Sequence, residues 1–563
     1  MQILSTLLWR TSRKGLSGTV VRCRKQSTYK YYSSNVSRLG VAWSASAAAF
    51  GVGVSALCLY HMQEERQPLR AEHDHSLRTR KLIDGAEIKK HNTADSCWVV
   101  VNGAVWDMTD FLAAHPGGMD AVLRVAGTDA SKVFNPIHPS DTLKEGLQPQ
   151  NCLGELDPNG EQVEISTPEV KPATVDPDQI LPLASIVDLD DFETMAKLGL
   201  SEKAWSYYAS TADDGKTYNS NRASWSGVIL RPRILVDVSN VDYSGQILGN
   251  KVDIPIYISP AALAKLAHEE GEVALCQGAY KSGIVQCISS NASCSLTEIH
   301  DAATAEQVLF FQLYVNRDSD KADALLKKLK TLPKIRAVYL TVDAPVGGKR
   351  VLDEKYKAAQ SQLSGSSDST STVMFSGVSP ALTWSYLDKL KSELPDGMPI
   401  MIKGVSTVED AIMAYKAGAT GIVLSNHGGR QLDTSPSPLL TLLEIRKHAP
   451  WLIKDNKGNG FEIHIDGGIR RGTDVLKALA LGATACGLGR PFLYSLANEY
   501  GVDGVVKVVD ILKNEMAIGM RLLGVTNLDD LRRHGHKFVN TKAMDPLVAD
   551  ADLSQWPELG QFK

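Results

Sequence analysis

The feature that most constrains the fold is an alternation of short apolar runs with helix-length segments through the C-terminal part of the chain. Apolar runs of this length are typical of parallel strands buried on both faces. Eight such strand-then-helix units predict an α/β chain folded as a (β/α)8 TIM barrel. The predicted strands are 254–259, 284–289, 308–315, 337–343, 399–404, 421–426, 462–467 and 485–490.

Polar side chains follow the predicted strands at the point where each strand ends. The sixth run leads into the segment SNHGGRQLD, which contains His427 and Arg430. The histidine could accept a proton, and the arginine could hold a carboxylate. In a barrel the reactive groups lie at the C-terminal ends of the strands, so these side chains are expected to share one site. The equivalent positions are Gln312, Tyr314, Asp343, Lys403, His427, Arg430, Asp466 and Arg490.

Two glycine loops follow the seventh and eighth strands. The segments DGGIRRG (466–472) and GLGRP (487–491) each open a predicted helix. Backbone N–H groups in such loops can approach a phosphate closely, and barrels commonly bind phosphate after these two strands. The sequence therefore predicts a phosphate-bearing cofactor.

One interval between strands is too long for an ordinary connection. Residues 344–398 separate the fourth and fifth strands and include the serine-rich segment SQLSGSSDSTSTVMFSG. Such a composition is not expected to bury a core. The sequence leaves open whether this segment is a mobile excursion over the mouth of the barrel or a disordered insertion without function.

The N-terminal 63 residues differ in composition from the rest of the chain. They contain no acidic residue and eight Lys or Arg, followed from Leu39 to Tyr60 by an uncharged run. This pattern resembles a mitochondrial presequence with an apolar sorting segment, predicted over residues 1–75, and predicts release into the intermembrane space. A permanent membrane anchor is the alternative. Without residues 1–63 the chain has 52 basic and 64 acidic residues, a net charge of −12, which favours a basic partner.

A separate small domain is predicted at residues 76–156. Its segment CWVVVNGAVWDMT reads as two strands with a turn at Asn102–Gly103, and the fragments FLAAHPGG and VFNPIHPS place His115 and His138 23 residues apart. This segment resembles the α+β cytochrome b5-like haem domain. The resemblance implies haem b with His115 and His138 as axial ligands, and hence electron transfer. Residues 157–182 contain five prolines and are predicted to be a semi-rigid hinge.

The eight cysteines are scattered and include no CxxC pair. This spacing predicts neither a zinc site nor a disulfide framework. Nothing in the sequence predicts a nucleic-acid partner.

The barrel motifs together resemble the FMN-dependent L-2-hydroxy-acid oxidising family. The segments that carry the resemblance are YYAS (207–210), QLYV (312–315), TVDAP (341–345), IKGV (402–405), SNHGGRQLD (425–433), DGGIRRGTDVLKALALGA (466–483) and GLGRPF (487–492). The family domain is predicted at 183–535, with a C-terminal tail at 536–563. The order of haem domain, hinge and barrel is similar to that of the flavocytochrome L-lactate dehydrogenases that reduce cytochrome c.

The resemblance implies a role for each residue of the predicted site. Arg430 and Tyr207 would hold the substrate carboxylate, and His427 would be the general base. Asp343 would orient His427, and Tyr314 would contact the substrate hydroxyl. Lys403 would stabilise negative charge on the reduced flavin. Arg350 would also bind substrate. The implied FMN contacts are Ala261, Ala262, Ser289, Gln312, Thr341, Lys403, Ser425, His427, Gly428, Asp466, Gly467, Gly468, Arg470, Gly489 and Arg490.

The implied reaction is oxidation of L-lactate or a related L-2-hydroxy acid to the 2-oxo acid (pyruvate from lactate) through FMN, with electrons passing via haem b to cytochrome c. A homotetramer without a permanent membrane span in its mature form is expected. Glycolate or mandelate are alternative substrates. A non-catalytic redox module and an oxidase that reduces oxygen directly are alternative functions. Hydride transfer and proton abstraction to a carbanion require the same residues, so the sequence leaves the choice open.

Three positions depart from the family pattern. Thr211 stands where a glycine is usual after YYAS, and GGKRV (347–351) replaces Leu-Gly-x-Arg-Glu while retaining Arg350. Asn291 stands where a large apolar residue is usual beside the substituent of the substrate. With Ala262 and Gly347, Asn291 is expected to shape the pocket around that substituent. These departures bear on substrate preference.

Overall fold

The computed structural model describes residues 81–167, 179–364, 370–453 and 460–556. The predicted presequence therefore lies outside the described residues. No helix within the described ranges is both long enough and apolar enough to cross a membrane.

The N-terminal domain is a five-stranded sheet with short helices. The strand order is β1-β5-β4-β3-β2, and the predicted hairpin is formed by β3 and β4. Asn102 and Gly103 both have positive φ, 51° and 81°, as a tight hairpin turn requires. The elements are β1 (Leu82–Ile83), α2 (Gly85–Ile88), β2 (Asn92–Thr93), β3 (Ser96–Val101), β4 (Ala104–Asp107), η1 (Thr109–Ala114), α3 (Met119–Leu123), α4 (Ser131–Phe134), α5 (Thr142–Gly146), η2 (Pro149–Asn151) and β5 (Cys152–Leu156).

The N-terminal domain continues beyond the predicted boundary at Leu156. Ile165 forms a β-bridge with Asp129, and Val163 is buried against Ile88 and Val105. The first part of the predicted hinge is therefore packed on this domain. Residues 168–178 of the hinge lie outside the described ranges.

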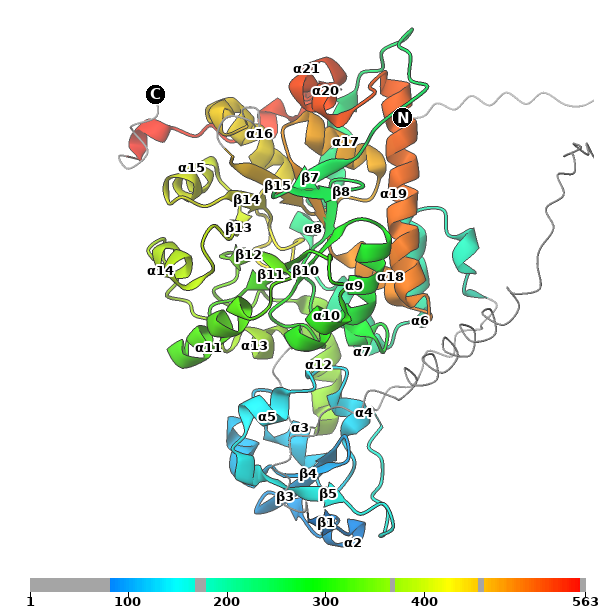
Figure 1. The fold of residues 1–563 in the computed structure, drawn as a ribbon, viewed down its shortest axis with the longest axis vertical. Helices are drawn as coiled ribbons and strands as arrows, with labels where there is room; N and C mark the ends of the chain where they lie inside the picture. The colour runs from blue at the N-terminus through cyan, green and yellow to red at the C-terminus, as the bar shows by residue number, and fades with distance from the viewer. Residues whose placement is uncertain (1–80, 168–178, 365–369, 454–459, 557–563) are drawn as a thin grey trace, which may run out of the picture. The chain divides into compact units, whose positions relative to one another are not determined.

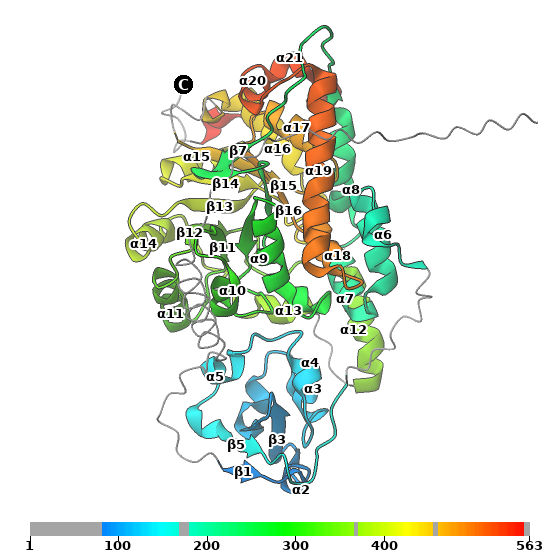
Figure 2. The same ribbon diagram turned by 45° about the vertical axis from the view of Figure 1, so that its right-hand side comes forward.

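The C-terminal domain contains the predicted closed barrel. Eight parallel strands pair in chain order, and the eighth pairs with the first (Figures 1 and 2). All eight coincide with the predicted apolar runs to within a few residues at their ends. The strands are β9 (Ile256–Ile258), β10 (Val285–Ile288), β11 (Leu309–Leu313), β12 (Ile335–Thr341), β13 (Ile400–Val405), β14 (Gly421–Leu424), β15 (Glu462–Asp466) and β16 (Ala485–Leu488).

The barrel interior is a packed core that is closed at its N-terminal end. Tyr257, Phe310 and Tyr339 fill it with smaller apolar side chains. The hairpin of β7 (Gly245–Ile247) and β8 (Asn250–Val252) adds Ile247 and Val252 to this core. Only the C-terminal ends of the strands are therefore left to form a site.

Helices surround the barrel (Figure 2). Capping boxes start two of them, with Asp188 at α6 and Ser295 at α10. The long helix α19 packs along α9, α17 and α18. The helices are α6 (Leu189–Gly199), α7 (Glu202–Ala209), α8 (Lys216–Ser224), α9 (Gly271–Lys281), α10 (Leu296–Ala302), α11 (Ser319–Lys330), α14 (Tyr386–Glu393), α15 (Val408–Lys416), α16 (Pro438–His448), α17 (Gly472–Ala480), α18 (Arg490–Leu496) and α19 (Gly501–Leu523).

The prediction that the interval 344–398 buries no core needs correction, and the segment predicted as a C-terminal tail has ordered contacts. The long interval 344–398 contains α12 (Val351–Ser364) and α13 (Thr370–Phe375) before α14, and Phe375 is buried. The predicted C-terminal tail is packed: β17 (Val539–Asn540) pairs with β6 (Ile229–Leu230), and Met544 is buried. The prediction for the interval relied on composition, which does not report burial against distant elements. Short helices α20 (Leu528–Arg533) and α21 (Gly535–Phe538) precede β17.

Candidate active site

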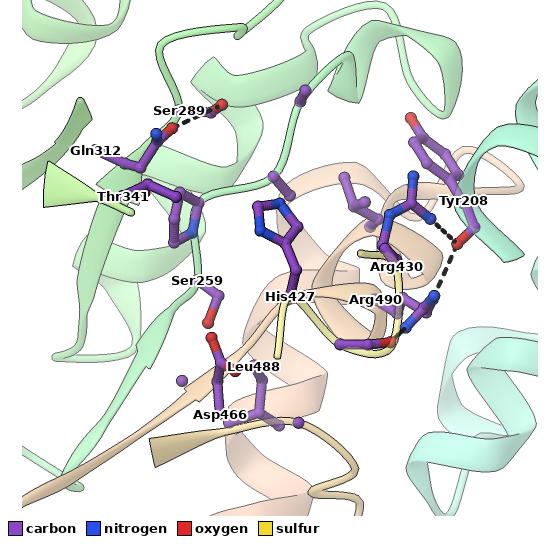
Figure 3. Close-up of a pocket in the computed structure, with 18 of the residues that line it drawn as sticks. Tyr208, Ser259, Ser289, Gln312, Thr341, His427, Arg430, Asp466, Leu488 and Arg490 are labelled. Atoms are coloured by element: carbon purple, nitrogen blue, oxygen red, sulfur yellow. Dashed lines mark hydrogen bonds between the residues drawn. The ribbon is translucent and has the colours of Figure 1, made fainter. Parts of the chain in front are cut away.

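The candidate active site is a pocket at the C-terminal ends of the barrel strands. Residues following all eight strands line it, joined by Tyr207 and Tyr208 of α7 (Figure 3). The pocket collects nearly every residue predicted from the strand ends and motifs. Asp343 and Ser425 lie behind the lining, where each hydrogen-bonds to His427. The predicted residues in the lining are Tyr207, Ala261, Ala262, Ser289, Gln312, Tyr314, Thr341, Arg350, Lys403, His427, Gly428, Arg430, Asp466, Gly467, Gly468, Arg470, Gly489 and Arg490.

His427 is held between an acid and a phenol. Its Nδ1 lies 3.0 Å from Asp343 Oδ1, and its Nε2 lies 3.2 Å from the hydroxyl of Tyr314. Since an ionised carboxylate only accepts hydrogen bonds, Nδ1 carries the ring proton and Nε2 keeps its lone pair. The arrangement presents a basic nitrogen to the pocket.

The protonation states around His427 suit a base. Burial lowers the pKa of His427 below its ordinary value, and Asp343 opposes this shift. Burial would raise the pKa of Asp343, but His427 and Lys403 outweigh it and lower that pKa overall. Burial raises the pKa of Tyr314 further above neutrality, so its hydroxyl remains a donor. At pH 7 the imidazole is therefore neutral beside an ionised Asp343.

Arg430 is placed as an anion clamp. Its Nη1 donates to the backbone carbonyls of Tyr207, Tyr208 and Ser210 at 2.9–3.0 Å, and Figure 3 shows the bond to Tyr208. Its Nε and Nη2 have no partner among the described residues, so one edge of the guanidinium remains available. Burial, together with the positive charges of Arg350 and Arg490, lowers the pKa of Arg430 to about 9. A bound carboxylate would relieve this repulsion.

Arg490 shares the carbonyls that Arg430 uses. Its Nε donates to Tyr208 O and its Nη2 to Ser210 O, both at 2.9 Å (Figure 3). Its Nη1 donates to Gly428 O at 2.9 Å. The two arginines together fix the YYAS segment beside the pocket.

The other side of the pocket fits a polar, planar cofactor. Several buried polar atoms there have no partner in the described chain, although native proteins satisfy most such atoms. They are Ser259 Oγ, Gln312 Nε2, Thr341 Oγ1 and Asp466 Oδ1. Lys403 is buried beside them, with its Nζ 3.1 Å from Ser425 Oγ and 3.7 Å from Asp466 Oδ2. Donors and acceptors in this pattern match the edge of a flavin ring.

The two glycine loops form the phosphate end of this pocket. Gly467 and Gly468 have φ of 90° and 75°, which favours glycine at both positions. A Cβ at Gly489 would meet only Ser259, at 3.9 Å, so the start of α18 is open to an approaching group. Arg470 and Arg490 supply positive charge there. These residues fit FMN.

The N-terminal domain holds its two predicted haem ligands together. The ring centroids of His115 and His138 lie 6.4 Å apart. His115 Nδ1 lies 2.9 Å from Gly118 O, and His138 Nδ1 lies 3.3 Å from Phe134 O. Because a carbonyl can only accept, each Nδ1 carries the proton and each Nε2 is free to ligate. Metal–imidazole bonds are about 2 Å long, so the separation of the rings suits two ligands on one iron.

The structure also adds pocket residues that sequence reasoning missed. Met374 and Phe375 of α13 line the pocket, and the Tyr207 hydroxyl donates to Met374 Sδ at 3.4 Å. Asn291 lines it as predicted, but Gly347 does not. After Thr341 the chain next lines the pocket at Arg350 and then at Met374 and Phe375, so closeness to the strand end was a poor guide at Gly347. Met374 and Phe375 lie within a serine-rich segment whose only signal was the sequence VMF.

Comparisons with known proteins agree with this geometry. The family described as "FMN-dependent dehydrogenase" matches residues 196–537, more than half of the chain. The chain belongs to the FMN-dependent dehydrogenase family. The family described as "Cytochrome b5-like Heme/Steroid binding domain" matches residues 84–157. Of the two ligands in that description, the pair His115 and His138 indicates haem, since a steroid would need no pair of imidazole ligands. FMN and haem are therefore the cofactors of this family member.

Two relatives match about four fifths of the chain. An L-lactate dehydrogenase (cytochrome) from Wickerhamomyces anomalus is 42% identical over 461 residues, which cover 79% of this chain and 78% of the relative. The enzyme of the same name from Saccharomyces cerevisiae is 40% identical over 476 residues, covering 80% and 79%. A solved double-mutant flavocytochrome b2 with pyruvate bound has a TM-score of 0.59 and 40% identity, and the match covers 66% of this chain and 91% of that one.

Replacing either His115 or His138 with Ala is expected to abolish haem binding while FMN remains bound, because each histidine supplies one of the two iron ligands. Absorption spectra of the purified variants measure both cofactors. His91→Ala is the matched control in the same domain, since His91 stacks on Trp98 and lies outside the histidine pair. Haem retained at full occupancy in both His115→Ala and His138→Ala would contradict the assignment.

Proposed function

We propose that this family member oxidises L-lactate, or a closely related L-2-hydroxy acid, to the 2-oxo acid and delivers the electrons through haem to cytochrome c. The observation that carries the proposal is the pairing of a neutral base with an anion clamp. His427 Nε2 and the free edge of Arg430 line one pocket. A hydroxy acid presents the two groups that such a pair recognises, a transferable proton and a carboxylate.

The side chains of the pocket perform distinct steps. Arg430 binds the carboxylate through Nε and Nη2, which fixes the orientation of the substrate. Tyr314 donates a hydrogen bond from its hydroxyl to the substrate oxygen and keeps its proton, and His427 Nε2 takes the proton that leaves the substrate. The Nδ1–H of the resulting imidazolium stays on Asp343, whose negative charge stabilises it. Bound FMN supplies the two-electron acceptor, and bound haem supplies the one-electron outlet.

The substrate preference depends on the wall around the substituent of the hydroxy acid. Ala262, Asn291, Met374 and Phe375 line the pocket. The name of the two relatives, L-lactate dehydrogenase (cytochrome), supports lactate as the substrate of this chain. Asn291 is smaller and more polar than a leucine, and one methylene changes discrimination by only about 1–3 kcal/mol. L-lactate is therefore proposed as a good substrate, with tolerance for larger or more polar acids.

The partner and location follow from charge and from the N-terminal segment. The basic, acid-free first 63 residues and the apolar run after Leu39 support import into mitochondria and release into the intermembrane space. The remaining net charge of −12 supports encounter with basic cytochrome c. A homotetramer is proposed from the family resemblance.

Replacing His427 with Gln tests the base. We expect flavin reduction by L-lactate to fall by about 10²–10⁴-fold, because a glutamine cannot take the proton. Arg430→Lys should mainly raise the apparent Kd for lactate, because a lysine loses the planar two-point contact. Anaerobic stopped-flow absorbance of the flavin separates the two effects.

The pH dependence gives the control for this test. Burial keeps the pKa of His427 below its ordinary value, so the rate of flavin reduction should fall only as the pH drops below about 6.5. That fall should be absent from the residual activity of His427→Gln. Near-normal flavin reduction in His427→Gln would refute the assignment of the base.

The rate of cytochrome c reduction should fall as the ionic strength rises. Long-range attraction between the acidic protein and a basic cytochrome is screened over a Debye length of about 8 Å at physiological salt. The second-order rate constant, measured at several NaCl concentrations, reports this attraction. Flavin reduction by lactate in the same buffers is the control for direct effects of salt on the barrel. A flat salt profile for cytochrome c reduction would contradict electrostatic steering.

A further inference from the structure

A buried carboxylate behind the pocket joins two loops of the barrel mouth. Glu272 lies in the first turn of α9 and is 1% exposed. Its Oε1 accepts from Ala264 N and Ser293 N, both at 2.9 Å. Its Oε2 accepts from Ser293 Oγ at 2.7 Å and from Cys294 N at 3.0 Å. Both oxygens are thus saturated by donors from residues outside its own helix.

These four bonds satisfy the buried carboxyl group of Glu272. The side-chain oxygens of Glu272 thus have their hydrogen-bonding capacity filled by three backbone N–H groups and one hydroxyl. No ion pair to Glu272 occurs among the described residues of the chain. The bonds from the two loops therefore replace the hydrogen bonds to water that burial removed. The same bonds fix both loops to the carboxyl group of Glu272.

The two loops that Glu272 joins are the walls of the pocket. The first follows β9 and contains Ala262, two residues before Ala264. The second follows β10 and contains Asn291, two residues before Ser293. Lys265 N also donates to Ser293 Oγ at 2.9 Å, which adds a direct link between the loops.

The loop after β9 also contacts the YYAS segment, which holds Arg430. Leu263 has a positive φ of 60°, an unusual conformation for leucine, and its carbonyl accepts the Tyr208 hydroxyl at 2.6 Å. The carbonyl of Tyr208 in turn accepts from Arg430 Nη1 at 3.0 Å (Figure 3). Three hydrogen bonds therefore connect Glu272 to Arg430, joined covalently by the Leu263–Ala264 peptide group and by Tyr208 itself.

We propose that Glu272 is a positioning residue for substrate and flavin, setting the distance between the wall at Ala262 and Asn291 and the clamp at Arg430. Its role in substrate discrimination rests on the proposed function, whereas its role in flavin binding does not. It touches neither ligand and acts through the loops. Because the reacting end of every hydroxy acid is the same, a shift of these loops changes the ranking of substrates as well as the rate.

The substitution Glu272→Gln tests this role with a nearly isosteric side chain. The amide nitrogen cannot accept a hydrogen bond, so two of the four donors lose their acceptor. We expect the Kd of the apoprotein for FMN to rise by about tenfold or more, because an unsatisfied buried donor costs about as much free energy as a tenfold change in affinity and the loops shift to avoid that cost. The ratio of kcat/KM for L-2-hydroxybutyrate to that for L-lactate should change by about threefold or more.

The control is the same substitution at another buried carboxyl. Glu444 on α16 is 7% exposed and lines no part of the pocket. Burial raises its pKa to about 7, so a neutral amide resembles its protonated form. Glu444→Gln should leave FMN affinity and the substrate ratio as in the wild type. Ser293→Ala removes one donor to Glu272 and the acceptor of Lys265 N but leaves the backbone donors to Glu272 in place, and it is the second variant should Glu272→Gln fold poorly.

The outcomes separate the possible accounts. A changed FMN Kd in Glu272→Gln and Ser293→Ala, with Glu444→Gln normal, supports the positioning role whether or not the wild type oxidises lactate. A lower Tm with unchanged FMN affinity and an unchanged substrate ratio would show that Glu272 is structural only and would overturn the proposal. Absence of turnover by the wild type with every hydroxy acid would refute the proposed function, while the FMN titration would still test Glu272.

Discussion

The chemistry of this protein depends on one hydrogen bond, between His427 Nδ1 and Asp343 Oδ1. Burial favours the neutral imidazole, and the carboxylate decides which nitrogen carries the proton. The Nε2 atom, which carries no proton, must then face the substrate. This requires the C-terminal ends of β12 and β14 to lie close together. Barrel closure brings these ends together, because the C-terminal ends of the parallel strands all converge on one mouth.

A second constraint is the concentration of positive charge at that mouth. Arg350, Arg430, Arg490 and Lys403 line one pocket, and burial with mutual repulsion lowers the pKa of Arg430 to about 9. Such a pocket is complementary to anions. The phosphate of FMN and the carboxylate of a hydroxy acid are two anions, and the arginines fall near the two places where they would bind. Substrate and cofactor thus compensate a charge that the apoprotein carries at a cost in stability.

The sequence predicted the strands, their order and most of the pocket, because parallel strands buried on both faces leave a clear apolar signal and catalytic groups follow their ends. It failed where contacts come from distant segments. Phe375 was hidden in a serine-rich stretch, and Gly347 was placed in the pocket only because it follows β12 closely. Glu272 gave no signal at all, since its partners at Ala264 and Ser293 are joined only by the fold.

The central claim is that electrons pass from a hydroxy acid to the barrel flavin and from there to the haem of the N-terminal domain. The most direct measurement is the absorption spectrum of the pure protein during anaerobic addition of L-lactate. The oxidised-flavin bands should disappear while reduced-haem bands appear, without any added electron acceptor. A flavin that bleaches while the haem stays oxidised would contradict the electron route, and a spectrum that does not change would contradict the activity itself.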